Sequence, residues 1–303
     1  MKVLDLFCGA GGFSYGFKKA GFNVIGADIS EKAKAAYLSN SVGKFIKADL
    51  SNELITDGFD TIIGGPPCKP WSTVNLARRK ESHGDYGLVE RFFKHVEANI
   101  PDVFLFENVP AIAHEASLDM NIKRMSEKYG YSVTKGFVSY MDYGAPTRRK
   151  RFIAVGVRKG DSKHFFELLS RYRVRNYSTV SDAIRHLEHV EFGAKIDHQW
   201  PNLKTIDRYK KYYKTGKYGW YILKWDDQAP SFGNVMKTYI LHPDSFNGGN
   251  TRVISIREAL LLMGFPKSYH FPKGQGLAVR YQMVADSVSP KFSSVAAKIL
   301  KEM

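Results

Sequence analysis

Cysteine is nearly absent from this chain, and so are long apolar runs. Its 303 residues include only Cys8 and Cys68, which excludes a disulfide framework and a zinc site built on paired cysteines, so we expect no metal. No apolar run approaches the ~20 residues that a membrane span needs, and Asp5 comes too early for a secretory signal peptide. These absences predict a protein of a reducing, intracellular compartment, most simply the cytoplasm.

Acidic residues are the second shortage. The chain has 30 aspartates and glutamates against 45 lysines and arginines, which gives a formal net charge of +15. Since lysine and arginine contacts to phosphate supply most non-specific affinity for nucleic acid, this excess favours a polyanionic partner. Net charge alone does not distinguish a protein that binds nucleic acid from one that is merely basic.

Short apolar runs alternate with amphipathic segments through the first half of the chain, and the helical period returns near the end. The predicted strands are residues 2–6, 23–27, 45–47, 59–63 and 103–106, followed by a closing pair at 133–139 and 151–158. The predicted helices are residues 13–20, 31–39, 88–98, 256–263 and 289–301. This β-α-β alternation predicts an α/β fold, with a parallel sheet covered by helices on both faces.

The pattern and the composition of the sequence change after about residue 159. Residues 160–228 lose the alternation and are rich in tyrosine, tryptophan, lysine and arginine, as in the segment 208–214. Basic residues interleaved with aromatic ones suit phosphate contact and base stacking, although a solvated edge with buried rings explains any single residue equally well. We therefore expect two domains: a catalytic and cofactor-binding domain of residues 1–159 and 253–303, and an inserted recognition domain of residues 160–252.

A lone cysteine stands at the exit of the strand expected at 59–63, in the segment Gly64-Gly65-Pro66-Pro67-Cys68-Lys69-Pro70-Trp71-Ser72. Open α/β sheets place their chemistry at the carboxyl ends of strands. The two prolines that precede Cys68 fix the backbone and remove two backbone N–H donors, so the thiol is held in one direction rather than left mobile. A packing cysteine needs none of these features, and the arrangement predicts a nucleophile.

A glycine-rich turn follows the first strand, in Asp5-Leu6-Phe7-Cys8-Gly9-Ala10-Gly11-Gly12. Glycines let the backbone come close to a ligand, and a dinucleotide-binding loop is one interpretation. Two acidic residues favour a different ligand. Asp28 ends the second strand, where its carboxylate can accept from both ribose hydroxyls. Asp49 follows the third strand, where its carboxylate can accept from the amine of adenine. The pair indicates S-adenosylmethionine, an adenosyl group without a pyrophosphate. The alternative is that each aspartate caps the next helix.

Five segments, in this order, resemble the motifs of the DNA cytosine-5 methyltransferases. They are DLFCGAGG (5–12), PPCKPWS (66–72), ENV (107–109), DYGAPTRRKR (142–151) and RVISIRE (252–258). The resemblance covers nearly the whole chain outside residues 160–228. It implies a Rossmann-like, S-adenosylmethionine-dependent methyltransferase sheet with a small inserted target-recognition domain.

The function that this resemblance implies is transfer of a methyl group from S-adenosylmethionine to carbon 5 of a cytosine in a specific short site of duplex DNA. Carbon 5 is unreachable inside a duplex, so the base must be flipped out. Such an enzyme serves a restriction-modification or orphan modification system. We expect a monomer, with any cognate restriction endonuclease acting separately.

The resemblance also implies roles for single residues. Cys68 matches the nucleophile that attacks carbon 6 of cytosine, and Glu107 matches the carboxylate that holds ring nitrogen N3 and the exocyclic amine. Arg151 matches the arginine that stabilises the activated base, with Arg149 as its companion. The residues expected at S-adenosylmethionine are Phe7, Gly9, Gly12, Asp28, Ile29, Asp49, Leu50, Pro67, Leu88, Asp286 and Ser287.

The residues expected at DNA are Ser72, Arg78, Arg79 and Arg252. The first three belong to a basic loop, residues 72–87, that is long enough to close over a flipped base. An ordinary solvated loop is the alternative.

The chain departs from the family pattern at Lys69 and Thr147, where glutamine is usual, and at Asp286, where asparagine is usual. Two other functions stay open. One is a tRNA cytosine-5 methyltransferase of the same fold, whose Cys-Phe-Thr signature is absent here, and the other is a non-catalytic DNA-binding homologue. A nicotinamide-dependent dehydrogenase explains the glycine turn but neither the Pro-Pro-Cys segment nor Glu107 with Asn108.

Overall fold

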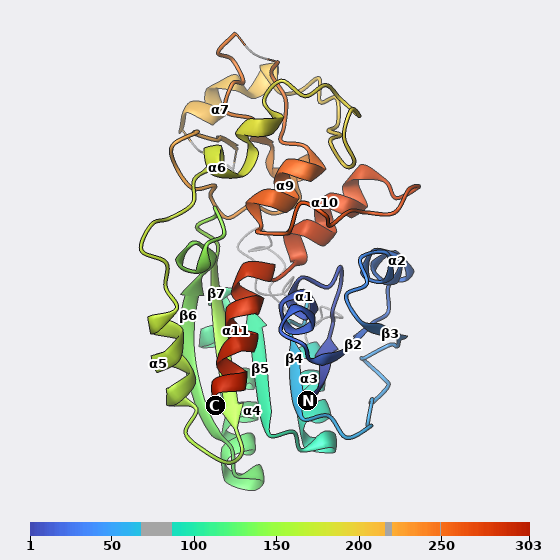
Figure 1. Cartoon of the computed structure of the whole chain (residues 1–303), viewed down its shortest axis with the longest axis vertical. Coiled ribbons are helices and arrows are strands. Elements are labelled where there is room, and N and C mark those ends of the chain that lie inside the picture. Colours follow the sequence, from blue (N-terminus) through green and yellow to red (C-terminus); the bar gives the residue numbers. More distant parts are fainter. Residues whose placement is uncertain (68–86, 216–219, 249) are drawn as a thin grey trace.

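Seven strands form the main sheet within the residues that the structure describes (Figure 1). The structure is a computed structural model and describes residues 1–67, 87–215, 220–248 and 250–303. The strands are β1 (Lys2–Leu6), β2 (Asn23–Asp28), β3 (Lys44–Lys47), β4 (Thr61–Gly64), β5 (Val103–Asn108), β6 (Ser132–Ser139) and β7 (Lys150–Val157). Their order is β3-β2-β1-β4-β5-β7-β6; the first five pair in parallel, and β7 pairs antiparallel with β5 and β6. The predicted α/β fold and the closing strand pair are confirmed.

The central parallel strands end within two residues of one another: β1 and β4 end level, β2 runs one residue further and β5 two. Leu6 pairs with Ala27 on one side and with Gly64 on the other, and Gly64 pairs with Phe106. The residues that follow β1, β2, β4 and β5 therefore gather at one edge of the sheet, where open α/β folds place their ligands.

Successive residues of each strand point to opposite faces of the sheet, and each face has its own core. Val3 packs in a cluster with α1 (Gly12–Lys19) and α11 (Pro290–Glu302), whereas Leu4 packs in a second cluster with α3 (Leu88–Asn99) and α4 (Ala116–Tyr129). Two further helices lie beside the sheet, α2 (Glu31–Ser39) next to β3 and α5 (Lys163–Arg171) against β6 and α11. Helices thus cover both faces, as predicted. None of the helices in the described residues is long and apolar enough to cross a membrane.

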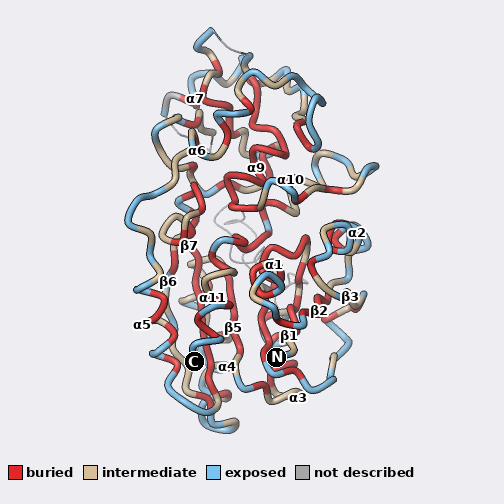
Figure 2. The backbone as a smooth tube through the Cα atoms, viewed as in Figure 1, coloured by how far each residue is buried: buried red, intermediate tan, exposed pale blue. Residues whose placement is uncertain are grey.

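A second group of elements lies beyond the strand ends, at the top of Figure 1, and we call it the upper region. It contains α6 (Val180–Ile184), α7 (Lys210–Thr215), α8 (Val235–Thr238), α9 (Ile256–Leu262), α10 (Leu277–Asp286) and the short parallel pair β8 (Tyr221–Ile222) and β9 (Ile240–Leu241). Helix α9 packs against α6 and α10, and Figure 2 shows buried backbone continuing from the sheet into α9. The division of the chain into two domains stays a prediction.

The C-terminal helix α11 crosses α1 at very short range. An ideal Cβ on Gly16 would lie 2.2 Å from the backbone nitrogen of Ser294 and 2.3 Å from the carbonyl carbon of Ser293. The Ser293 hydroxyl donates to the Phe13 carbonyl at the same crossing. Only glycine fits at position 16, and α11 is thereby held beside the helix that follows the glycine turn.

Gly16→Ala is expected to destabilise the protein, although alanine is the better helix former by about 1 kcal/mol. The added methyl group meets the backbone of α11, and overpacking of this kind costs ~1–3 kcal/mol. Urea unfolding measures the change. Gly276→Ala is the control, because its added methyl group meets no atom within 4 Å. Equal unfolding midpoints for the two variants would contradict the close crossing.

Candidate active site

The glycine turn follows β1 at the shared edge of the sheet. Gly9 and Gly11 have φ values of 51° and 85°, in the left-handed region that glycine adopts most easily. A Cβ on Gly9 would meet no atom within 4 Å, so the turn leaves open space on that side. Phe7 precedes them with a φ of 58°. Cys8 is buried beside Tyr37 and Val42, and burial raises the pKa of its thiol, so Cys8 is a packing residue.

Asp28 is joined to this turn by hydrogen bonds. Its carboxylate accepts from the backbone N–H of Gly9 (3.0 Å) and from that of Ser30 (2.9 Å). Burial raises the pKa of Asp28, a shift that the two hydrogen bonds oppose. The next side chain, Ile29, is 60% exposed although it is large and apolar. The end of β2 thus offers a fixed carboxylate and an apolar surface next to the open side of Gly9.

Asp49 stands at the end of β3, and its oxygens are engaged locally. They accept from the Ser51 hydroxyl (2.6 Å) and backbone N–H (3.0 Å) and from the Asn52 side chain (3.0 Å). These hydrogen bonds, that of the Ser51 hydroxyl first, lower the pKa of Asp49. The next residue, Leu50, is buried, and its carbonyl accepts from Arg91 (2.8 Å). Asp49 therefore stabilises the turn at residues 49–52; no described helix begins there, so it does not cap a helix as the alternative supposed.

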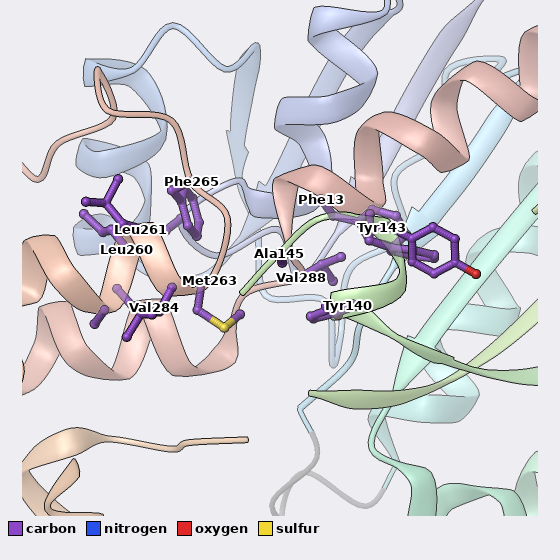
Figure 3. Close-up of a cluster of buried hydrophobic side chains, with 14 of the residues drawn as sticks. Phe13, Tyr140, Tyr143, Ala145, Leu260, Leu261, Met263, Phe265, Val284 and Val288 are labelled. Atoms are coloured by element: carbon purple, nitrogen blue, oxygen red, sulfur yellow. The ribbon is translucent and has the colours of Figure 1, made fainter. Parts of the chain in front are cut away.

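The C-terminal segment closes on the glycine turn. An ideal Cβ on Gly12 would lie 2.3 Å from the Val288 carbonyl oxygen and 3.1 Å from the Ser287 Cβ, so glycine permits this approach. Figure 3 shows Val288 in one buried cluster with Phe13, which follows Gly12. Ser287 is buried, and Asp286 beside it is exposed. The structure thus brings together two predicted site residues, Gly12 and Ser287, from opposite ends of the chain.

A buried ion pair lies at the end of β5. The Arg151 Nε is 3.0 Å from Glu107 Oε1, and both side chains are about nine-tenths buried. Arg151 is held on β7, the antiparallel neighbour of β5. The Tyr140 hydroxyl donates to the same Glu107 oxygen at 3.1 Å. The motifs predict that Glu107 and Arg151 act together. They do not predict Tyr140, for which the chain carries no signal beyond its place just before the motif at 142–151.

The segment after β4 lies against this pair. An ideal Cβ on Gly65 would lie 2.8 Å from Glu107 Oε2, and the Asn108 side chain donates to the Pro66 carbonyl at 3.0 Å. The half-buried Pro67 then leads toward residue 68. The predicted nucleophile Cys68 and the predicted DNA contacts Ser72, Arg78 and Arg79 lie outside the described residues. Leu88, the first residue of α3, is half-buried.

Arg149 joins the segment before β7 to the upper region. Its Nη1 donates to the Phe232 carbonyl at 2.9 Å, and its Nη2 donates to the Ala285 carbonyl. Beside it the backbone N–H of Arg148 donates to the Ala229 carbonyl at 2.8 Å. Arg149, which precedes Arg151 by two residues, thus holds the backbone of the upper region close to the buried ion pair.

Arg252 is buried in an ion pair rather than exposed. Its two terminal nitrogens donate to the two carboxylate oxygens of Glu258 at 2.7 and 2.8 Å, and its guanidinium lies 4.3 Å from the centre of the Trp200 ring. This geometry fixes the start of α9, whose first residue follows Ser255. A contact between Arg252 and DNA would have to break this pair.

The aromatic rings of the upper region pack on one another. Trp220 lies 4.5 to 5.6 Å, centre to centre, from Tyr209, Tyr212, Tyr213 and Tyr239. The neighbouring cations Arg208, Lys210 and Lys211 are exposed or half-exposed. The cations of this segment are thus accessible to a polyanion, whereas its rings form a small core. Within the described residues no group of three or more His, Cys, Asp or Glu side chains is arranged to hold a metal ion.

Comparisons with known proteins agree on one family. The sequence profile described as C-5 cytosine-specific DNA methylase matches residues 1–303. The chain is 28% identical to the Type II methyltransferase M.FnuDI of Fusobacterium nucleatum, over 100% of this chain and 94% of that protein. It is 26% identical to the Type II methyltransferase M.NgoPII of Neisseria gonorrhoeae, over 100% and 96%.

Two solved structures share the fold. The methyltransferase EhMeth of Entamoeba histolytica has a TM-score of 0.77 at 16% identity, covering 100% of this chain and 98% of its own. The Dnmt2 methyltransferase of S. pombe has a TM-score of 0.74 at 16% identity, covering 100% and 99%.

A buried aspartate lies beneath the glycine turn. Asp5 Oδ2 accepts from the Ser14 hydroxyl at 2.6 Å, and the Tyr37 hydroxyl donates to Ser14 at 2.9 Å. Burial raises the pKa of Asp5 from 3.8 to about 7. Between these pH values the folded protein holds a proton that the unfolded chain has lost, so this group makes folding less favourable as the pH rises.

Asp5→Asn is expected to remove this pH dependence. The loss of stability due to Asp5 amounts to ~1.4 kcal/mol per pH unit between the two pKa values and stops above the folded pKa of about 7. Urea unfolding of both proteins from about pH 4 to pH 8 measures it, and the difference should move steadily in favour of asparagine. A difference that does not vary with pH would contradict the buried, protonated Asp5.

Proposed function

The chain belongs to the C-5 cytosine-specific DNA methylase family, and from this we propose how its residues share the work of cytosine methylation. The enzyme is an S-adenosylmethionine-dependent DNA cytosine-5 methyltransferase, related to the type II methyltransferases of restriction-modification systems. The observation that carries the proposal is the buried Glu107–Arg151 pair, beside the segment that leads to Cys68.

The residues at the strand ends fit S-adenosylmethionine. Asp28 presents a fixed carboxylate for the ribose hydroxyls, the open side of Gly9 leaves room for a ligand, and the exposed Ile29 offers an apolar surface for adenine. The bound molecule supplies an electrophilic methyl group. We assign to this site the residues Phe7, Gly9, Gly12, Asp28, Ile29, Asp49, Leu50, Pro67, Leu88, Asp286 and Ser287. For Asp49 the assignment requires that its carboxylate also accept a hydrogen bond from outside its turn.

The chemistry on cytosine begins with addition. Carbon 5 of cytosine is a poor nucleophile until a group adds to carbon 6, and a thiolate is suited to add and later to leave. Cys68 is the proposed nucleophile. Glu107 holds N3 and the exocyclic amine, and Arg151 stabilises the negative charge that develops on the ring, as preorganised polar groups do in other enzymes. Arg149 supports this pair by fixing the backbone next to it.

The proposed recognition domain is residues 160–252, of which α6, α7, α8, β8 and β9 lie in the upper region. The net charge of +15 and the accessible cations of α7 suit the phosphates of duplex DNA, and the base must leave the helix to reach Cys68. The basic loop with Ser72, Arg78 and Arg79 is assigned to contacts near the flipped base. We further propose that the enzyme acts in the cytoplasm as a monomer, with any cognate endonuclease a separate protein.

Cys68→Ser and Glu107→Gln are expected to abolish or strongly reduce methyl transfer. The serine variant should lose on the order of 1,000-fold or more, because a hydroxyl is a far weaker nucleophile than a thiolate, and the glutamine variant about 10²- to 10⁴-fold. Transfer of a tritiated methyl group from S-adenosylmethionine to unmethylated duplex DNA, and in parallel to tRNA, measures both.

Covalent trapping on DNA that contains 5-fluorocytosine is the control. The wild-type protein should form a complex that survives denaturation, and Cys68→Ser should form none. A serine variant as active as the wild type would contradict the proposal. Transfer to tRNA without transfer to DNA would favour the tRNA alternative, and DNA binding with no transfer would favour the non-catalytic one.

The double variant Lys210→Ala/Lys211→Ala is expected to weaken DNA binding in a salt-dependent way. If each lysine contacts one phosphate, the slope of log K against log salt concentration falls by about 2. Titrations of duplex DNA at several salt concentrations measure the slope. Lys123→Ala/Lys128→Ala, on α4 at the opposite end of the molecule in Figure 1, removes the same charge and should leave the slope unchanged. Equal slopes for the two variants would contradict the role of α7.

A further inference from the structure

The two oxygens of the Glu107 carboxyl group have different surroundings. Oε1 lies within hydrogen-bond distance of two donors, the Arg151 Nε at 3.0 Å and the Tyr140 hydroxyl at 3.1 Å. Oε2 accepts from no donor among the described residues and lies over Gly65, 2.8 Å from the position of an ideal Cβ there. The carboxyl group is therefore held from one side and open on the other.

Tyr140 is built to donate from a fixed position. Its ring is fully buried and stacks on Phe292 of α11, with ring centres 5.7 Å apart and an interplanar angle of 26°. Its backbone N–H donates to the Arg149 carbonyl at 3.0 Å, and its carbonyl accepts from Ala145. Burial, with the nearby Glu107 charge, raises the pKa of Tyr140 well above its usual range, so the phenol keeps its proton. Figure 3 shows Tyr140 in the buried cluster with Tyr143 and Ala145.

We propose that Tyr140 is a positioning residue: together with Arg151 it occupies Oε1 of Glu107, and so directs Oε2 toward the target cytosine. This inference deepens the proposed function and rests on it. Two donors at Oε1 favour negative charge on that oxygen, so a proton carried by Glu107 sits on Oε2. Gly65 contributes the space that Oε2 needs, because any side chain there would meet it.

This orientation matters at the addition step. As an electron pair of the Cys68 thiolate forms the bond to carbon 6, the π electrons between carbons 5 and 6 shift through carbon 4 toward N3. For this step Glu107 first takes up a proton from solvent on Oε2. N3 takes that proton, and Glu107 returns to the carboxylate that the two donors at Oε1 stabilise. Without Tyr140, Oε1 keeps only the arginine, and the proton has two oxygens to occupy rather than one.

Tyr140→Phe tests the proposal against a matched control, Tyr143→Phe. Both phenols are buried and both rings contact Phe292, that of Tyr143 at 5.4 Å, but only the Tyr140 hydroxyl donates to Glu107. Tyr140→Phe is expected to lower kcat about 10- to 100-fold, the range for losing a hydrogen bond to a charged group, and to leave KM for DNA within about two-fold. Tyr143→Phe should leave both constants within about two-fold.

A second measurement isolates the addition step. On duplex DNA amplified with 5-tritiated dCTP, and without methyl donor, tritium is released to water when Cys68 adds to carbon 6, a proton from water adds to carbon 5 and the tritium leaves. The release therefore reports addition without methyl transfer. Tyr140→Phe should slow this release by the same factor as kcat, and the effect should shrink below about two-fold in the Glu107→Gln background, since Tyr140 acts through Glu107. Rates are expressed per molecule that becomes trapped on 5-fluorocytosine DNA, so a misfolded fraction does not contribute.

Each outcome bears on one of the two proposals. A wild-type protein that methylates DNA, with Tyr140→Phe equal to it or to Tyr143→Phe, overturns the role of Tyr140 and leaves the proposed function intact. A loss that persists in full in the Glu107→Gln background also overturns it. A wild-type protein that neither methylates DNA nor releases tritium overturns the proposed function itself.

Discussion

The nearly level ends of the parallel strands are the constraint on which the rest of this structure depends. The register that pairs Leu6 with both Ala27 and Gly64, and Gly64 with Phe106, puts four strand exits in one row. The strand ends therefore bring four features together at one edge of the sheet: the glycine turn, Asp28, the Gly65–Pro67 segment and Glu107. A slip of one residue in β5 would turn Glu107 to the opposite face of the sheet, away from Arg151. Hydrophobic burial on both faces thus fixes the chemistry indirectly, because it fixes the register.

Closure of the site depends on residues from the other end of the chain. The glycines at positions 12 and 16 remove the atoms that would keep the C-terminal segment away, so Val288 and α11 lie directly against α1. The same helix supplies Phe292, on which Tyr140 stacks. The glycine turn, the buried Glu107 and the C-terminal helix therefore belong to one packed unit, and small residues at the contact points are as necessary to it as the polar ones.

The sequence predicts the elements of the sheet better than it predicts hydrogen-bond partners. Apolar periodicity locates β1 and α2 to the residue, since a strand buried on both faces and a capped helix leave clear patterns. It places β4 two residues early at its start, and it predicts no helix at α4, α5 or α10. Motif order brings Glu107 and Arg151 together correctly. It does not predict the partners of Arg149 or Arg252. The carbonyls that Arg149 meets lie in distant segments of the chain, whereas Arg252 meets Glu258 only six residues further on, because the turn before α9 brings them together. The contact of Tyr140 with Glu107 is not predicted either.

The link made by Arg149 has a consequence for how such an enzyme changes its target over evolutionary time. Arg149 and the backbone N–H of Arg148 donate to carbonyl oxygens of the upper region, those of Phe232, Ala285 and Ala229, and every amino acid has one. The Arg148 side chain adds one side-chain contact, an ion pair with Asp227 at 3.1 Å. The contacts of Arg149 therefore do not depend on which side chains stand at positions 232 and 285, as long as the path of the backbone is kept. If this region recognises the DNA site, as we propose, a lineage can acquire a new recognition sequence by substitution there, and the Glu107–Arg151 pair next to Arg149 keeps the same support. The proposed chemistry can then stay constant while the recognised sequence varies, because Arg149 contacts main-chain atoms of the upper region.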